Sequence, residues 1–317
     1  MRKKISLKRF SIFIKGMAMG VADIIPGVSG GTIAIITGIY EELLKTLNNL
    51  DLNLLKKLIK GDFNELNKEY NLNFLFALLT GIFSSIIILS HSITYLIIKH
   101  PISLWSFFFG IILSGIIVLI KKINNWNFKN FEFIFSSKIY LMVFGCTIAF
   151  IIQIVNPSYN QPTHIYLFFC GMLSITAMLL PGISGAYILV LLGTYETMLN
   201  TFKEVIKFNS DYFLNFFSFA TGALISIKLF SKFLSWAYDK YKDNTLSCLV
   251  GFMIGSLPSL WPWKIESSSE NIFFNTLYIP KGYFSNIEFN KGLIFITIGF
   301  ITILILEYLS IKNAKAK

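Results

Sequence analysis

The chain alternates long apolar stretches with short polar segments that carry most of its charge. Six stretches are each long enough to cross about 30 Å of hydrocarbon as a helix that rises 1.5 Å per residue. They are residues 74–98, 102–120, 139–155, 213–236, 246–263 and 292–311. This pattern predicts an all-α polytopic membrane protein with about six full spans.

Two further apolar stretches, residues 10–47 and 165–199, are each interrupted by a proline-glycine pair, Pro26-Gly27 and Pro181-Gly182. Proline removes a helical hydrogen bond, and glycine frees the backbone dihedral angles. Each half of these stretches has about 15 residues, too few for a full crossing. We therefore expect two helical hairpins, either re-entrant or broken.

The two interrupted stretches are copies of each other. Residues 16–44 align without gaps to residues 171–199, with 12 identities in 29 positions. Three spans separate the copies, and an odd number of crossings gives the copies opposite orientations. The sequence therefore predicts an inverted-topology internal repeat, which is the architecture of many secondary transporters.

This repeat divides the chain into four expected parts. The parts are a first repeat at 1–125 (hairpin 10–47, spans 74–98 and 102–120), a linking span at 126–160, a second repeat at 161–263 (hairpin 165–199, spans 213–236 and 246–263), and an external loop with the last span at 264–317.

The positive charges are distributed unevenly between the two expected sides of the membrane. Of 28 Lys and Arg residues, 20 lie in the segments 1–9, 45–70, 121–138, 232–242 and 312–317, and six lie in the segments on the other side. The positive-inside rule then places both termini in the cytoplasm. The net charge of +11 reflects this topology, so no nucleic-acid partner is expected.

A candidate anion site follows each proline-glycine pair. After Gly27 a helix restarts at Ser29, Gly30, Gly31 and Thr32, and the first backbone N–H groups of a helix lack intrahelical partners. Glycines let a ligand approach that backbone, and the helix dipole favours an anion. The alternative is that these small residues only permit tight helix packing. The corresponding residues of the second copy are Gly182, Ser184, Gly185, Ala186 and Tyr187.

Five charged residues in or beside these stretches are further candidates. Asp23 has Met178 as its counterpart, and an intramembrane carboxylate is costly, so Asp23 could carry a coupling proton or cap the hairpin tip. Glu41 lies 12 residues beyond Ser29, about 18 Å along a helix, so Glu41 and its counterpart Glu196 could act as gates or be ordinary interfacial residues. Lys228 and Lys15 could meet a phosphate, or could extend to the interface. The simplest role for Tyr40 and Tyr195 is that of anchors at the membrane interface.

One signature occurs in both copies. The motifs are Gly20-Val21-Ala22-Asp23, Pro26-Gly27-Val28-Ser29-Gly30-Gly31-Thr32 and Gly38-Ile39-Tyr40-Glu41, with Pro181-Gly182-Ile183-Ser184-Gly185 and Gly193-Thr194-Tyr195-Glu196. They resemble the signature of the DUF368 family of bacterial and archaeal membrane proteins. The resemblance implies a translocase that recycles undecaprenyl phosphate, the lipid carrier of cell-wall synthesis, from the outer to the inner leaflet. Its partners would then be a polyprenyl-phosphate lipid, the bilayer, and protons or another coupling ion.

The sequence supports two other classes of function less well. Gly27-Val28-Ser29-Gly30-Gly31 fits G-x-S-x-G, but a serine nucleophile needs a His base, and His91 lies near the outer end of its span. We therefore expect no enzyme, no cofactor and no metal. A secondary transporter of a small anion or another solute stays open, because the motifs cannot separate a free phosphate from a lipid head group.

Overall fold

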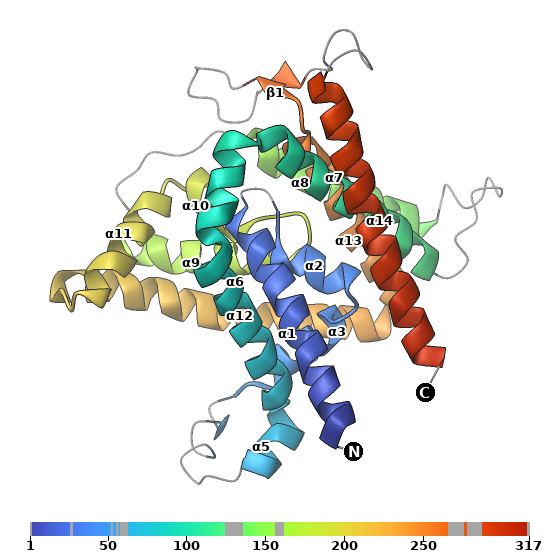
Figure 1. Ribbon diagram of the computed structural model, residues 1–317. Helices are drawn as coiled ribbons and strands as arrows, with labels where there is room; N and C mark the ends of the chain where they lie inside the picture. The colour runs from blue at the N-terminus through green and yellow to red at the C-terminus, as the bar shows by residue number, and fades with distance from the viewer. Residues whose placement is uncertain are drawn as a thin grey trace.

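The computed structural model describes residues 2–25, 28–51, 53–54, 57, 63–123, 136–155, 162–265, 276–277 and 287–315. Helices account for nearly all of this part of the chain (Figure 1). The α-helices are α1 (Arg2–Ile24), α2 (Gly30–Ile36), α3 (Tyr40–Asn49), α5 (Phe63–Tyr70), α6 (Leu72–Lys99), α7 (Pro101–Lys122), α8 (Ser137–Ile154), α9 (His164–Leu179), α10 (Gly185–Leu191), α11 (Tyr195–Ile206), α12 (Phe213–Lys240), α13 (Lys242–Ser256) and α14 (Ile287–Lys315). Two short strands, β1 (Lys264–Ile265) and β2 (Thr276–Leu277), pair antiparallel.

Five helices of the described chain are long and apolar enough to cross a membrane: α6, α7, α8, α12 and α14. The expectation of an all-α polytopic membrane protein is confirmed. The sixth expected span, residues 246–263, is a shorter element, because α13 has 15 residues and ends at Ser256. A 3-10 turn over Leu257–Leu260 follows, with Pro258 near its start, and proline cannot continue the helical hydrogen bonds.

Each interrupted stretch forms three helices instead of two. A long helix (α1 or α9) leads into the loop, a seven-residue helix (α2 or α10) follows, and a third helix (α3 or α11) turns away. The second turn lies at Gly38 and Gly193, whose φ angles are +74° and +65°. Residues with a β-carbon rarely adopt such angles, so glycine is needed at both positions. The sequence pattern predicted only the break at proline.

The long helices of the two copies pack in matching ways. Helix α1 packs along α6, and α9 along α12. A β-carbon on Gly16 would lie 2.3 Å from the Leu78 carbonyl oxygen, and one on the equivalent Gly171 would lie 2.3 Å from that of Phe219. Such close backbone approach is typical of small residues at helix contacts in membranes.

Each of the next helices packs against a helix from the other half of the chain. Helix α7 of the first copy packs along α14, and α13 of the second copy packs along α8. A β-carbon on Gly110 would lie 2.1 Å from the Ile296 carbonyl oxygen, and one on Gly251 would lie 2.0 Å from that of Met142. This reciprocal exchange is what a two-fold relation between the halves requires. The correspondence extends the repeat to α8 and α14, beyond the two spans per half that the sequence suggests.

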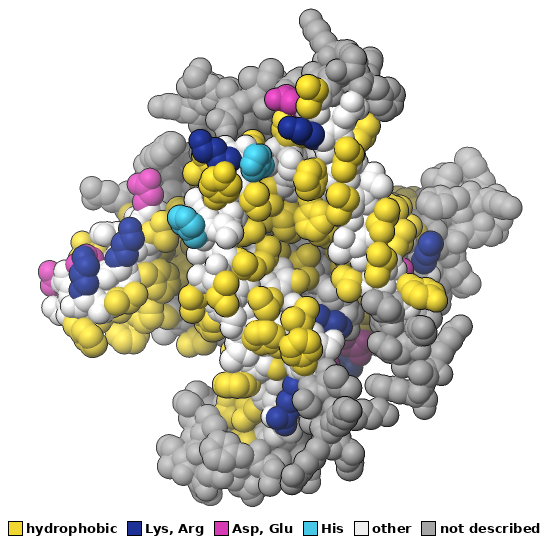
Figure 2. Space-filling view, in the orientation of Figure 1, with side chains coloured by type: hydrophobic (Ala, Val, Ile, Leu, Met, Phe, Trp, Pro, Cys, Tyr) yellow, Lys and Arg dark blue, Asp and Glu magenta, His cyan; other side chains and the backbone are white. Residues whose placement is uncertain are grey.

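The surface and the centre of the protein both fit a membrane environment. Apolar side chains are spread over much of the visible face in Figure 2. Exposed apolar side chains include Ile87 at 78% and Leu224 at 65%. The charged side chains lie toward the periphery of that face. All seven residues of α2 are buried, and α2 contacts α9 of the second copy.

Candidate functional site

The two hairpin loops contact each other directly. The Ser29 hydroxyl donates to the Met178 carbonyl at 3.3 Å and to the Leu180 carbonyl at 3.4 Å. The Gly182 N–H donates to the Thr32 hydroxyl at 2.8 Å. Ser29 and Thr32 are fully buried. Side chains of the first hairpin therefore satisfy the backbone of the second loop.

Tyr40 extends this contact. Its hydroxyl donates to the Leu179 carbonyl at 2.7 Å, and its side chain is buried. The expectation that Tyr40 is an interfacial anchor is wrong, because its side chain is buried and its hydroxyl is bound to the end of α9. Its counterpart Tyr195 is 38% exposed.

The leading N–H groups of α2 are all used within the protein. Gly30 donates to the Asp23 carboxylate oxygen Oδ1 at 2.7 Å, and Gly31 donates to Ser29 Oγ at 3.2 Å. Thr32 donates to the Ser29 carbonyl at 3.0 Å. Asp23 and Ser29 thus occupy the backbone donors that the sequence assigned to an anion.

The second hairpin differs because Met178 stands where the first has a carboxylate. The Tyr187 N–H donates to Ser184 Oγ at 3.4 Å. No acceptor in the described part of the chain takes the N–H of Gly185 or of Ala186. Ala186 is exposed. Unused donors at a helix start therefore occur in the second hairpin and not in the first.

Several glycines of the signature are needed for packing. A β-carbon on Gly31 would lie 2.8 Å from the Met178 carbonyl oxygen, and one on Gly185 would lie 2.6 Å from that of Ser174. These distances support the packing explanation for both residues, whether or not an anion also binds. Gly27 lies outside the described residues.

Only one of the two carboxylate oxygens of Asp23 takes part in the cap. Its Oδ1 caps α2, whereas its Oδ2 is buried and has no hydrogen-bond partner in the described chain. Buried polar atoms normally have partners, and an unpartnered one requires an explanation, such as a transient ligand or proton. The geometry shows the cap, and the coupling role stays a prediction.

The two lysines within the apolar stretches each extend their ammonium group to the C-terminal end of another helix. The Lys15 ammonium donates to the Thr37 carbonyl at 2.7 Å, where α2 ends. The Lys228 ammonium donates to the carbonyls of Asn48 and Leu50, where α3 ends, the latter at 2.8 Å. A cation at a helix C-terminus is favourable because of the helix dipole. Neither lysine is hydrogen-bonded to the part of the hairpin loops that the structure describes; Lys15 is bound to Thr37, and Lys228 to Asn48 and Leu50.

Glu41 does not continue the helix that begins at Gly30, so the expected 18 Å extension along one helix is wrong. The turn at Gly38 separates the two helices. Glu41 instead forms an ion pair with Lys45 at 2.8 Å, and Lys45 also contacts Asp239 of α12 at 3.1 Å. Glu196 is exposed at the start of α11. A gating role for either residue stays a prediction.

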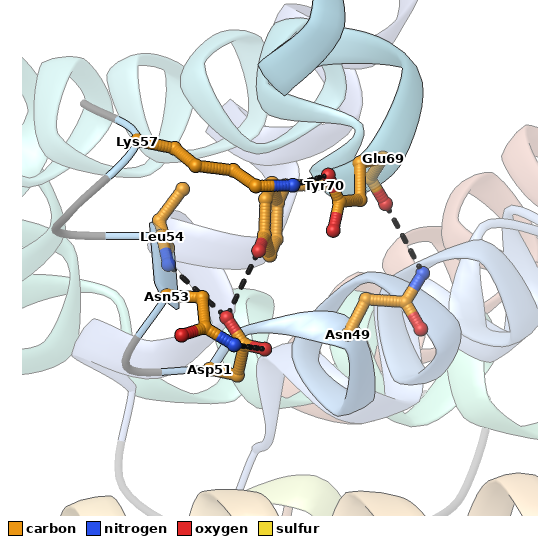
Figure 3. Close-up of polar contacts among 7 residues, drawn as sticks. All are labelled: Asn49, Asp51, Asn53, Leu54, Lys57, Glu69 and Tyr70. Carbon is orange, nitrogen blue, oxygen red and sulfur yellow. Dashed lines mark hydrogen bonds and ion pairs between the residues drawn. The ribbon is translucent and has the colours of Figure 1, made fainter. Parts of the chain in front are cut away.

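A polar cluster joins the end of α3 to α5 (Figure 3). The Tyr70 hydroxyl donates to Asp51 at 2.9 Å, and this bond holds the pKa of the Asp51 carboxyl below its usual value. Lys57 forms an ion pair with Glu69, whose carbonyl accepts from Asn49 at 3.4 Å. Tyr70 is buried, and the cluster holds the end of α5 against the end of α3.

Sequence reasoning missed Gln153. Its amide nitrogen donates to the Gly255 carbonyl at 2.6 Å, and its amide oxygen is buried without a partner among the described residues. The signal in the sequence was a single amide side chain near the end of the largely apolar α8. In the described part of the chain, no group of three His, Cys, Asp or Glu side chains could hold a metal.

The sequence is similar to those of known proteins. The profile of the VCA0040-like family, described as undecaprenyl phosphate translocase-like, matches residues 19–272. A Vibrio cholerae protein named polyprenyl-phosphate transporter is 38% identical over 273 residues, which are 84% of this chain and 84% of that protein. A Staphylococcus aureus protein of the same name is 31% identical over 262 residues, or 78% of this chain and 85% of that protein. No solved structure matches.

Paired hairpins, exchanged helices and an apolar surface define a multi-pass membrane protein of the inverted-repeat class. Within that class, the chain belongs to the undecaprenyl phosphate translocase-like family. The resemblance of its duplicated signature is thereby confirmed.

Proposed function

We propose that the protein transports undecaprenyl phosphate between the leaflets of the bacterial cytoplasmic membrane, returning the lipid carrier to the inner leaflet for cell-envelope synthesis. The observation that carries this proposal is family membership, with the Vibrio cholerae relative covering 84% of both chains. The inverted repeat supports it, because two related halves can expose one central site to either leaflet in turn.

The proposed orientation has both termini in the cytoplasm. The distribution of 20 basic residues against six supports it.

The lipid phosphate is proposed to pass at the paired loops. Backbone donors of Gly185 and Ala186 and the buried Oδ2 of Asp23 support this placement. A phosphomonoester carries up to two negative charges, which helix N-termini favour. An arriving phosphate beside the Asp23 carboxylate would repel it, so proton uptake by Asp23 is the proposed coupling step.

No enzymatic reaction is proposed. The only hydroxyl at the centre of the G-x-S-x-G motif, that of Ser29, donates to backbone carbonyls and not to a His base. A serine nucleophile needs a neighbouring base to become reactive.

The test is a leaflet-resolved assay of undecaprenyl phosphate in vesicles that contain the full chain. Ala186→Pro removes one backbone donor from the first turn of α10, where proline is tolerated. Ala186→Ser keeps that donor and serves as the matched control. We expect lipid-phosphate transport with wild type and Ala186→Ser, and a loss of at least tenfold with Ala186→Pro.

A second arm measures uptake of inorganic phosphate by the same vesicles. Uptake of inorganic phosphate without movement of the lipid would replace this proposal with a small-anion transporter. Equal transport by Ala186→Pro and Ala186→Ser would refute the placement of the phosphate at the second hairpin.

A further inference from the structure

A groove of about 500 Å³ lies between α8, α12 and α13. Its floor is buried and apolar, formed by Leu234, Leu249 and Phe252. Its walls include Phe144 and Phe233, which are 57% and 54% exposed. The groove therefore opens sideways, toward the hydrocarbon that surrounds the protein.

One end of the groove reaches the paired loops. Leu180, which lines it, accepts the hydrogen bond from Ser29 through its carbonyl. Phe252 also lines it, and a β-carbon on Gly182 would lie 2.7 Å from the Phe252 carbonyl oxygen. The apolar surface of the groove thus reaches the paired loops.

The other end is polar and basic. Tyr241, Asn244 and Thr245 line it at the turn between α12 and α13. Lys240 and Lys242 flank Tyr241 beside this end, and the Lys240 ammonium lies 5.4 Å from the centre of the Tyr241 ring. The neighbouring acids Asp239 and Asp243 are paired with Lys45 and Lys138. In the proposed orientation this end lies at the cytoplasmic interface, so the groove spans the inner half of the membrane.

We propose that this groove binds polyprenyl phosphate in the inner leaflet, with its isoprenoid chain along the apolar floor and its phosphate beside Lys240 and Asn244. This inference rests on the proposed function and deepens it by assigning a site for the lipid tail. A lipid in the inner leaflet directs its phosphate to the interface and its chain to the midplane, which is the polarity of the groove.

The charge at the mouth favours this lipid over an ordinary phospholipid. A polyprenyl phosphate is a phosphomonoester on one chain, and its head group carries close to two negative charges near neutral pH. A membrane phosphodiester carries one negative charge and two chains. A single groove with basic residues at its interfacial end matches the former.

Photolabelling of the wild-type protein tests the occupant. The probe is undecaprenyl phosphate with a diazirine in its isoprenoid chain, added to vesicles that contain the full chain. We expect label on residues of α12 and α13 that line the groove. Excess unlabelled undecaprenyl phosphate should remove it, and the same excess of phosphatidylglycerol should not. Equal displacement by phosphatidylglycerol would mean a groove for ordinary phospholipid and would overturn the proposal.

A transport measurement gives an independent test. Ala237→Phe adds an aromatic ring within the groove, whereas Leu229→Phe adds the same ring on α12 at a 60% exposed position outside it. We expect Ala237→Phe to reduce transport at least tenfold and Leu229→Phe to leave it unchanged.

The outcomes separate the two proposals. Lipid transport by wild type with equal rates for both variants would refute the groove and leave the proposed function standing. Failure of the wild type to move the lipid would refute both. If Ala237→Phe does not fold, the photolabelling result decides alone.

Discussion

Asp23→Met copies into the first hairpin the residue that the second hairpin has at the same place, Met178. In the wild type the Asp23 carboxylate accepts the N–H of buried Gly30 at 2.7 Å. A hydrogen bond to a charged group contributes about 1.5–3 kcal/mol, and a buried donor without a partner costs about 1–3 kcal/mol. Part of this is offset because the buried carboxylate is itself costly. We therefore expect Asp23→Met to lower the free energy of unfolding by about 1–3 kcal/mol.

Asp23→Asn separates the cap from the charge. Its amide oxygen can still accept from Gly30, so the loss of stability should be below about 1 kcal/mol. The amide cannot take up a proton, so lipid-phosphate binding should persist while the pH dependence of transport between pH 6 and 9 flattens.

The assays are denaturant unfolding in mixed micelles and vesicle transport across that pH range. Met178→Leu, a change on a 39% exposed side chain, serves as the control for stability. Wild-type stability in Asp23→Met would refute the capping role. An unchanged pH response with normal turnover in Asp23→Asn would reduce Asp23 to a structural cap.

Three further substitutions test other contacts. Tyr40→Phe should cost about 1–2 kcal/mol in denaturant unfolding because it leaves the Leu179 carbonyl without its donor, whereas Tyr195→Phe at the exposed counterpart should cost little. Lys228→Met should speed hydrogen exchange at the end of α3, and exposed Lys232→Met should not. Tyr70→Phe should raise the pKa of Asp51 toward its usual 3.8 in an NMR titration. Because the folded-state pKa is depressed, the stability from this bond is present above pH 3.8 and is lost as the pH falls through the folded-state value, so the mutational effect should vanish in acid.

Hydrophobic length and the duplicated signature predicted the membrane class, the hairpins and the family. These features could be predicted because each depends on a continuous stretch of sequence, either an apolar run or a repeated motif. The shortening of α13 was also readable in principle, because Pro258 lies inside the expected span. The second turn was not predicted, since Gly38 and Gly193 stand alone within apolar runs, and a lone glycine does not by itself end a helix.

The candidate site was only partly predictable, because its contacts join residues far apart in the chain. Asp23 was identified as an unusual carboxylate, but its bond to Gly30 depends on how the loop folds back. Lys15 and Lys228 were identified as cations within apolar stretches, but the carbonyls that they meet lie where α2 and α3 end, and the sequence pattern did not predict these two ends. Tyr40 was misassigned because its partner, the Leu179 carbonyl, lies far along the chain.

The differences between the two halves have an energetic consequence. In an exact inverted repeat, exchanging the halves would convert an inward-facing state into an outward-facing one of equal free energy. Here the shared residues, such as Ser29 with Ser184, keep the two hairpins alike in form. Asp23 is matched with Met178, so the first hairpin satisfies its own donors and the second leaves them for a ligand. A ligand that binds one arrangement more tightly shifts the population only by that difference in affinity. A phosphate held by the second hairpin, and repelled by the charged first one, supplies such a difference, and protonation of Asp23 would remove it.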